Sequence, residues 1–226
     1  NIKDLKKLDK VIKKEKPDLI IHLAAQSIVS LSYKDPKDTL ETNIIGSFNI
    51  LEAVRKNKIE NLIYVTSDKC YLNKDEKIIY VETDRLGGQD LYSASKASAE
   101  IIFQAYIKSF FSKNKKIKFA TARAGNVIGG GDWSEDRLVP DCIKSWSKKK
   151  RVMLRNPNST RPWQHVLEPL SGYLLLGHKL INKKLKSNLI PSWNFGPHKR
   201  NCKKVKFIVQ LLISEWGKKQ KIIFKK

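Results

Sequence analysis

The pattern of apolar and polar positions predicts helix, strand and helix at the start of the chain. Apolar residues recur at helical spacing among lysines over residues 5–12, so a surface helix is expected to end near Pro17. Residues 18–25 then form an apolar run that ends in small residues, which is typical of a buried strand. Helical spacing returns over residues 36–57 and predicts a longer amphipathic helix.

The alternation continues with two further strands. Residues 62–66 and 117–122 are apolar runs of strand length. Between them, a loop with Gly87 and Gly88 leads to a predicted helix over residues 92–111. Strands that alternate with helices favour a parallel sheet covered by helices on both faces. The predicted fold class is therefore α/β, with a doubly wound parallel sheet.

Polar residues follow each of these three strands. The clusters cover residues 24–27, 66–69 and 123–131. In open parallel sheets, ligands bind beyond the carboxyl ends of the strands. Because all three clusters lie at those ends, they predict one ligand site at the rim of the sheet.

After residue 131 the pattern is less regular. The short elements expected there cover residues 138–146, 152–154, 166–181, 193–195 and 205–216. These elements predict a smaller α/β lobe over the strand ends, with domains at residues 1–131 and 132–226. Whether the two domains interleave stays open at this point.

The composition limits the classes of function. With 226 residues, 41% of them hydrophobic, the chain can bury the core of one large domain or two small ones. The net charge of +23 is mostly scattered lysine, and arginine, which recognises phosphates and bases with two hydrogen bonds, is sparse. Solvated lysine-rich faces are favoured over a nucleic-acid surface. A basic nucleic-acid-binding protein remains the non-enzyme alternative.

Cysteines and apolar runs indicate the compartment. Cys70, Cys142 and Cys202 are odd in number and far apart, which favours neither a disulfide framework nor a zinc site. No apolar run has the length of a membrane span and no signal peptide is visible. We therefore expect a cytoplasmic protein with no metal site and no membrane contact.

Tyr92 and Lys96 form a Tyr-x-x-x-Lys pair in the predicted helix. Residues four apart share one helix face, so the phenol and the ammonium can meet in one pocket. A neighbouring positive charge lowers the pKa of an acid by roughly 1–3 units, which moves a tyrosine from about 10 toward neutrality. Such a phenolate can take the proton of a sugar alcohol while a hydride leaves the same carbon.

Several motifs carry a resemblance over nearly the whole chain. They are Pro17-Asp18, His22-Leu23-Ala24-Ala25-Gln26, Thr42-Asn43-x-x-Gly46, Thr66-Ser67-Asp68-Lys69-Cys70-Tyr71, Tyr92-Ser93-x-Ser95-Lys96-Ala97, the stretch from Arg123 to Trp133, Arg137-Leu138-Val139-Pro140 and Arg161-Pro162-Trp163-Gln164-His165-Val166. With these motifs the chain resembles the extended short-chain dehydrogenases/reductases, and within them the CDP-glucose 4,6-dehydratases.

The resemblance implies conversion of CDP-glucose to CDP-4-keto-6-deoxyglucose with loss of water, by means of bound NAD. Removal of hydride from C4 makes a ketone, which acidifies the C5 proton and permits loss of the C6 hydroxyl. The same hydride then returns to C6. The enzyme alternative is another extended reductase, such as a sugar-nucleotide 4-epimerase. A homodimer or a higher homo-oligomer is usual for the family.

The resemblance also implies roles for five residues. Tyr92 is expected to be the base at the C4 hydroxyl, and Lys96 to hold the nicotinamide ribose. Ser67 should donate a hydrogen bond to the C4 oxygen. Asp68 should protonate the departing C6 hydroxyl, for which it must be neutral. Lys69 stands where related dehydratases carry glutamate, the expected C5 base.

The remaining implied contacts concern cofactor and substrate. Cofactor contacts are expected from Leu23, Ala24, Ala25, Gln26, Asn43, Thr66, Tyr92, Lys96 and Ala124. Substrate contacts are expected from Ser67, Asn126, Arg137, Arg161 and His165, with Arg161 suited to the diphosphate.

The chain departs from the family pattern in two respects. The glycine-rich turn that holds the cofactor pyrophosphate is absent, so we expect about one βαβ unit upstream of Asn1 and a closing segment after Lys226. Residues 1–131 would then be a partial NAD-binding domain, and residues 132–226 a partial substrate-binding lobe. Ser30 stands where an arginine is expected, which puts that substrate contact in doubt.

Some polar and aromatic residues have simpler explanations. His22 is expected to be a packed strand residue rather than a proton carrier. The run of three glycines at 129–131 could be a flexible turn or a phosphate site, and both alternatives stay open. The tryptophans expected to be core or interface anchors are Trp133, Trp146, Trp163 and Trp193.

Overall fold

The chain folds into two compact units. The computed structural model describes residues 1–73, 79–114, 116–182, 192–217 and 220–224. The first unit combines Asn1–Ala124 with Pro169–Phe195, and the second combines Gly125–Glu168 with Gly196–Lys226. The units therefore interleave along the chain, which differs from a single boundary after residue 131. The assignment of cofactor and substrate binding to separate domains stays a prediction.

A parallel sheet forms the centre of the first unit. Its strands β1 (Ile20–His22), β2 (Asn61–Val65), β3 (Lys118–Ala124) and β8 (Ser192–Phe195) pair in the order β1-β2-β3-β8, all in parallel. Parallel neighbours need crossover connections, which helices supply here. The predicted α/β fold class is confirmed.

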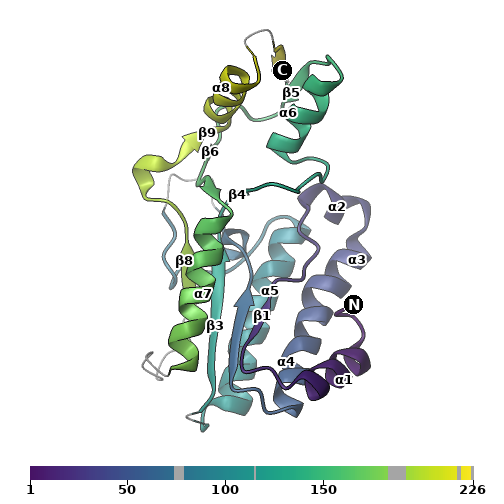
Figure 1. Cartoon of the computed structure of the whole chain (residues 1–226). Helices are drawn as coiled ribbons and strands as arrows, with labels where there is room; N and C mark the ends of the chain where they lie inside the picture. Colours follow the sequence, from purple (N-terminus) through teal and green to yellow (C-terminus); the bar gives the residue numbers. More distant parts are fainter. Residues whose placement is uncertain (74–78, 115, 183–191, 218–219, 225–226) are drawn as a thin grey trace. The chain divides into compact units, whose positions relative to one another are not determined.

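Helices cover both faces of this sheet (Figure 1). Helices α1 (Leu5–Glu15), α4 (Ser47–Lys56) and α5 (Leu91–Tyr106) pack on one face, and α7 (Leu167–Ile181) packs on the other. Successive strand residues point to opposite faces. Accordingly, the fully buried Leu62 joins the α1/α4/α5 core, whereas its neighbour Ile63 joins the α7 core.

The long helix predicted over residues 36–57 forms, with an irregular middle part. It consists of α3 (Pro36–Leu40), the π-helical turn η1 (Glu41–Gly46) and α4, and the short helix α2 (Val29–Lys34) precedes it. Asp35 caps α3 by accepting a hydrogen bond from the main-chain N of Asp38. The helix of residues 92–111 also forms, as α5 followed by the π-helical turn η3 (Ile107–Phe111). π-Helical turns are often found at functional sites, and η1 carries Asn43.

Strand β8 and most of α7 lie in the first unit, although the sequence pattern placed them in the second lobe. β8 pairs with β3 over four residues, from Thr121 opposite Ser192 to Ala124 opposite Phe195. α7 is the helix of the crossover between these two strands. Hydrophobic periodicity is a local signal, so it identified both elements without identifying their partners.

The second unit has a small core of its own. Helix α6 (Leu138–Ser147) and helix α8 (Val205–Trp216) pack there with β5 (Val152–Leu154) and β10 (Ile222–Phe224), which pair in parallel. The described residues of this unit form two further strand pairs. They are β4 (Val127–Ile128) with β7 (Gln164–His165), and β6 (Thr160–Arg161) with β9 (Lys203–Lys204).

Within the described ranges, no helix combines the length and the apolar character needed to cross a bilayer.

Candidate active site

The turn after β2 presents three predicted site residues. It is the short 3₁₀ helix η2 (Asp68–Cys70), which Ser67 caps by accepting a hydrogen bond from the main-chain N of Lys69 at 3.2 Å. The Ser67 hydroxyl also donates to Asp68 Oδ1 at 3.1 Å. Ser67, Asp68 and Lys69 are half-buried, so this turn holds a hydroxyl, a carboxyl and an amino group at the strand end while leaving each partly accessible.

The first turns of α5 hold Tyr92 and Lys96. Asp90 caps the helix by accepting hydrogen bonds from Ser93 N at 2.9 Å and from Ser93 Oγ at 2.6 Å. A Cβ atom on Gly88 would lie 2.2 Å from Ala94 N, so a glycine is required where the preceding loop meets the helix. Tyr92 and Lys96 are both buried, at 7% and 6% exposure.

The structure brings these two segments together. Cys70 and Tyr71, at the end of the η2 turn, pack in one cluster with Ala97 of α5. The charge of Lys96 also interacts with the Cys70 thiol. The candidate acid, hydroxyl and lysine of η2 therefore lie at the same end of the sheet as the Tyr92–Lys96 pair.

Burial perturbs Lys96. It lowers the pKa of the ammonium from 10.5 to about 8, against the opposing effects of Cys70 and Glu100. Across the residues that the structure describes, the Lys96 ammonium makes no hydrogen bond. A buried cation with free donor capacity is well suited to bind an oxygen-rich ligand.

We expect Lys96→Met to stabilise the folded protein at neutral pH. One pKa unit corresponds to about 1.4 kcal/mol, so the buried charge costs roughly 3 kcal/mol below pH 8. Between the folded pKa of about 8 and the unfolded value of 10.5, the unfolded chain binds the extra proton. The free energy of unfolding therefore increases as pH rises through this window, because the destabilisation by the buried Lys96 charge disappears.

Denaturant unfolding of wild type and Lys96→Met at several pH values measures this effect. The gain in stability should be largest at pH 7 and should shrink toward pH 10.5. Lys6→Met, which changes an exposed lysine of α1, is the matched control and should leave the pH dependence unchanged. If the free energy of unfolding depended on pH equally in wild type and Lys96→Met, the claim that Lys96 carries a buried charge would be contradicted.

His22 has the environment of a packed residue. Burial and then the charge of Lys96 lower its pKa to about 4, so the ring is neutral at pH 7. Its ring lies 5.1 Å from that of Tyr64, and its Nε2 lies 3.5 Å from Ser47 Oγ. These contacts agree with the packing role predicted for His22.

Gln26 and Asn43 link the loop after β1 to the helix of Tyr92. Asn43 Oδ1 accepts from Gln26 N at 2.9 Å, and Asn43 Nδ2 donates to Gln26 O at 2.9 Å and to Ser95 Oγ at 3.0 Å. Ser95 Oγ in turn donates to the carbonyl of Tyr92 at 2.7 Å. Both amide hydrogens of Asn43 are thus used within the protein, and its contact with a cofactor stays a prediction.

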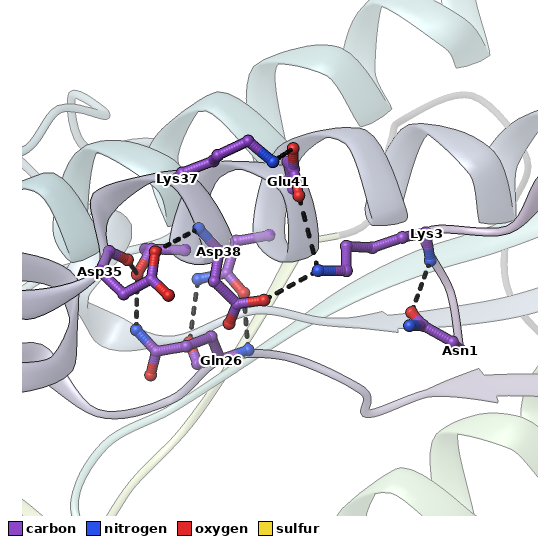
Figure 2. Close-up of polar contacts among 9 residues, drawn as sticks. Asn1, Lys3, Gln26, Asp35, Lys37, Asp38 and Glu41 are labelled. Carbon is purple, nitrogen blue, oxygen red and sulfur yellow. Dashed lines mark hydrogen bonds and ion pairs between the residues drawn. The ribbon is translucent and has the colours of Figure 1, made fainter.

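Ion pairs connect the N-terminal segment to the helical segment that contains Asn43. Lys3 Nζ lies 2.9 Å from Asp38 Oδ1 and 3.5 Å from Glu41 Oε2. Figure 2 shows Lys3 and Gln26 beside the helical segment that carries Asp38 and Glu41. Lys37 pairs with the same Glu41. The segment before α1 is thereby fixed to the helix that positions Asn43.

The other expected cofactor residues lie at the strand ends. Leu23 and Ala24 are exposed just after β1, and Ala25 is half-buried. Thr66 is buried after β2, and Ala124 is the last residue of β3. Because β1, β2 and β3 are parallel, these residues share the rim of the sheet that carries η2.

The expected substrate residues other than Ser67 belong to the second unit. The Asn126 carbonyl accepts from Gln164 N at 2.9 Å, and Arg161 Nη1 donates to the Thr160 carbonyl at 3.0 Å. The two remaining residues are Arg137, whose Nε lies 3.9 Å from Asp132 Oδ2, and His165, whose Nδ1 accepts from Leu167 N at 3.3 Å. Their contacts with a substrate stay predictions.

The glycine run at 129–131 has a partly structural explanation. A Cβ atom on Gly129 would lie 2.6 Å from Val166 Cγ1, so close packing between the residue after β4 and the residue after β7 requires glycine there. Gly131 has a positive φ of 83°, which side chains rarely adopt. Both observations favour the turn explanation for these two positions.

Sequence reasoning missed a buried ion pair beside the site. Glu100 on α5 and Arg123 on β3 are 0% and 1% exposed and lie 2.8 Å apart. The available signal was a glutamate one helical turn after Lys96, on the buried face. The partner was not apparent, because strand and helix are distant in sequence.

Fold and site together define the class of protein. A parallel sheet covered by helices, with its polar residues at the carboxyl rim, is a doubly wound nucleotide-binding type of fold. The chain belongs to the NAD dependent epimerase/dehydratase family, whose sequence profile matches residues 1–185.

Individual relatives agree with this family. A CDP-glucose 4,6-dehydratase of Salmonella typhimurium is 43% identical over 222 residues, which cover 96% of this chain and 61% of the relative. A dTDP-D-glucose 4,6-dehydratase of Dictyostelium discoideum is 29% identical over 79% of this chain and 42% of its own length. The chain thus spans less than two thirds of these relatives.

Solved structures show the same fold. The UDP-glucose 4-epimerase of Thermotoga maritima, solved with UDP-glucose, matches 100% of this chain and 69% of its own chain. The TM-score is 0.84 at 21% sequence identity, so this likeness concerns the fold.

Proposed function

We propose that the protein is a sugar-nucleotide 4,6-dehydratase that converts CDP-glucose to CDP-4-keto-6-deoxyglucose and water with NAD. The observation that carries the proposal is the packing of the Ser67-Asp68-Lys69 turn against the helix with buried Tyr92 and Lys96. The identity of 43% to a CDP-glucose 4,6-dehydratase supports the choice of substrate.

The residues at the rim fit NAD. Lys96 offers a buried ammonium to the hydroxyls of the nicotinamide ribose, and exposed Leu23 and Ala24 offer apolar surface at the end of β1. Gln26, Thr66 and the remaining rim residues would complete the contacts. When bound, NAD supplies the redox chemistry, because it takes up the electrons removed at C4 and gives them back at C6.

The protein residues would then move the protons and orient the sugar. Tyr92, as phenolate beside the Lys96 cation, takes the proton of the C4 hydroxyl. Ser67, whose single hydroxyl proton is directed at Asp68 Oδ1, would turn it to the C4 oxygen of the bound sugar. Asp68 gives its proton to the C6 hydroxyl, which leaves as water after the C5 proton has been lost. Lys69 is the candidate base for that C5 proton.

Incubation of the intact protein with CDP-glucose and NAD tests the proposal. We expect a product that absorbs strongly in alkali and shows a C6 methyl signal by NMR. UDP-glucose and dTDP-glucose in parallel measure the base preference. A C4 epimer in place of the keto sugar would favour the epimerase alternative and overturn the dehydratase.

Partners follow from the same proposal. The expected partner is the nucleotide sugar, and self-association into a homodimer or a higher oligomer is proposed for the intact protein. Exposed Ile101 and Phe110 provide apolar surface on α5 and η3 for such a contact.

A further inference from the structure

One buried guanidinium contacts both segments of the candidate site. Arg123 projects from β3 and donates from Nε to Glu100 Oε1 at 2.9 Å and from Nη2 to Glu100 Oε2 at 2.8 Å. Thr66, at the end of β2, donates to the same Glu100 Oε1 at 2.5 Å. The carboxylate of α5 is thus fixed to the ends of two strands by a two-pronged pair.

The other donors of Arg123 reach the η2 side. Nη1 donates to the Tyr71 hydroxyl at 2.7 Å and to the Glu82 carbonyl at 3.0 Å, and Nη2 donates to Ser192 Oγ at 3.0 Å. All five N–H groups of the guanidinium are therefore used. Tyr71 directly follows η2, and its hydroxyl donates to Asn194 Oδ1 at 2.6 Å.

The partners of Arg123 lie close in sequence to the candidate base and the candidate acid. Glu100 lies one helical turn after Lys96 and two turns after Tyr92, on the same face of α5. Tyr71 lies two residues after Lys69. Arg123 is consequently bonded to the helix that carries the base and to the turn that carries the acid.

Stability alone is a weak reason for such a pair. Burying two charges costs desolvation energy, and an apolar pair of similar volume often gives an equally stable protein. A bidentate guanidinium with five satisfied donors instead fixes relative orientation, because each bond restricts direction as well as distance.

We propose that Arg123, Glu100 and Tyr71 are positioning residues that hold the Asp68 turn in register with the Tyr92–Lys96 helix, and that Glu100 also keeps Lys96 charged. The proposal rests on the dehydratase function proposed above. Its second part follows from the place of Glu100 one helical turn after Lys96 on the buried face of α5, where its negative charge raises the pKa of an ammonium that burial lowers.

Among the residues that the structure describes, few other titratable groups act on Lys96. The groups that interact with it or lie beside it are Cys70 on η2, His22 on β1, and Tyr92 and Glu100 on α5, with Arg123 behind Glu100. Burial raises the pKa of the Cys70 thiol, and His22 is neutral at pH 7. Among these described groups, Glu100 is therefore the negative charge that opposes the effect of burial on Lys96.

Tyr71→Phe tests the link to η2. It removes one hydroxyl from the contacts of Arg123 and Asn194 and retains the ring. We expect kcat to fall about tenfold while KM for CDP-glucose changes less than twofold, because the loss of one hydrogen bond is sufficient to misplace Asp68. Tyr106→Phe is the matched control, because the hydroxyl of Tyr106, the last residue of α5, likewise makes a side-chain hydrogen bond, to Glu52 at 3.3 Å, and this variant should keep wild-type kcat.

Glu100→Gln tests the charge on Lys96. We expect the alkaline limb of the pH–rate profile to move to lower pH, because neutral Lys96 then forms more readily. NMR titration of the Lys96 side chain in labelled protein measures the same shift without turnover, so it stays informative if the dehydratase proposal fails. If the wild-type protein formed no keto sugar from CDP-glucose, the dehydratase function would be refuted. If Lys96 titrated at the same pH in Glu100→Gln and wild type, the proposed effect of Glu100 on Lys96 would be refuted.

A double replacement covers the case in which Glu100→Gln does not fold. Glu100→Met with Arg123→Met removes both charges together, which buried pairs commonly tolerate. We expect a folded protein with kcat reduced at least as much as in Tyr71→Phe. Wild-type kcat in both Tyr71→Phe and the double variant would overturn the positioning role.

Discussion

Replacement of Tyr92 by phenylalanine is expected to lower the turnover of CDP-glucose by about 10²–10⁴-fold, the contribution typical of a positioned acid or base. Tyr92 is 7% exposed and lies one helical turn before the buried Lys96, and a phenyl ring fills the same space. The alkaline absorbance of the keto sugar measures the rate, and circular dichroism with thermal unfolding checks the fold.

The control for this change is another tyrosine. Tyr33→Phe alters a residue of α2 that is 70% exposed, and it should keep wild-type turnover. Substrate affinity of Tyr92→Phe, measured by calorimetry with CDP-glucose, should stay within a few-fold of wild type. If Tyr92→Phe turned over at the wild-type rate, the phenol would not be the base.

The sequence predicted those parts of the site that depend on local patterns. Helical spacing placed Tyr92 and Lys96 on one face of α5, and the apolar run before Ser67 placed the η2 turn at a strand end. Their meeting followed from a topological rule, since the carboxyl ends of parallel strands form one rim. The position of the two clusters was predictable because it required only element order.

Contacts between distant segments were not predictable in this way. Arg123 was visible as part of a motif, but its pairing with Glu100 depends on the rotation of α5 over β3. The pairing of β8 with β3 brings Ser192 and Asn194 into the same network from a segment 69 residues beyond Arg123. A single sequence contains no signal for such pairings beyond burial of the charge itself.

The structure shows where the lysines behind the net charge lie. Among the residues that the structure describes, Lys96 is the one lysine in the buried class. The other described lysines are at least partly exposed on many different elements, which supports the expectation of solvated basic faces behind the net charge of +23. Among the described lysines, the one with a strongly lowered pKa therefore lies one helical turn after the candidate base Tyr92.

Asp68→Asn is expected to reduce formation of the keto sugar by about 10²–10⁴-fold, because an amide has no acidic proton to give to the departing C6 hydroxyl. The change conserves size, and the amide oxygen can still accept the hydrogen bond from Ser67 at 3.1 Å. Binding of CDP-glucose should therefore stay near wild type. The measurement is the alkaline absorbance together with the C6 methyl signal by NMR.

The same variant separates the two enzyme functions. Elimination of water needs a proton donor at the C6 oxygen, whereas epimerisation at C4 breaks no bond at C6. Asp68→Asn should thus abolish product in a dehydratase and spare it in an epimerase. Asp9→Asn, a matched change on α1, should have no effect in either case. Undiminished formation of the keto sugar by Asp68→Asn would remove Asp68 as the acid, and the proton for the expelled water would have to come from a different group on the same rim.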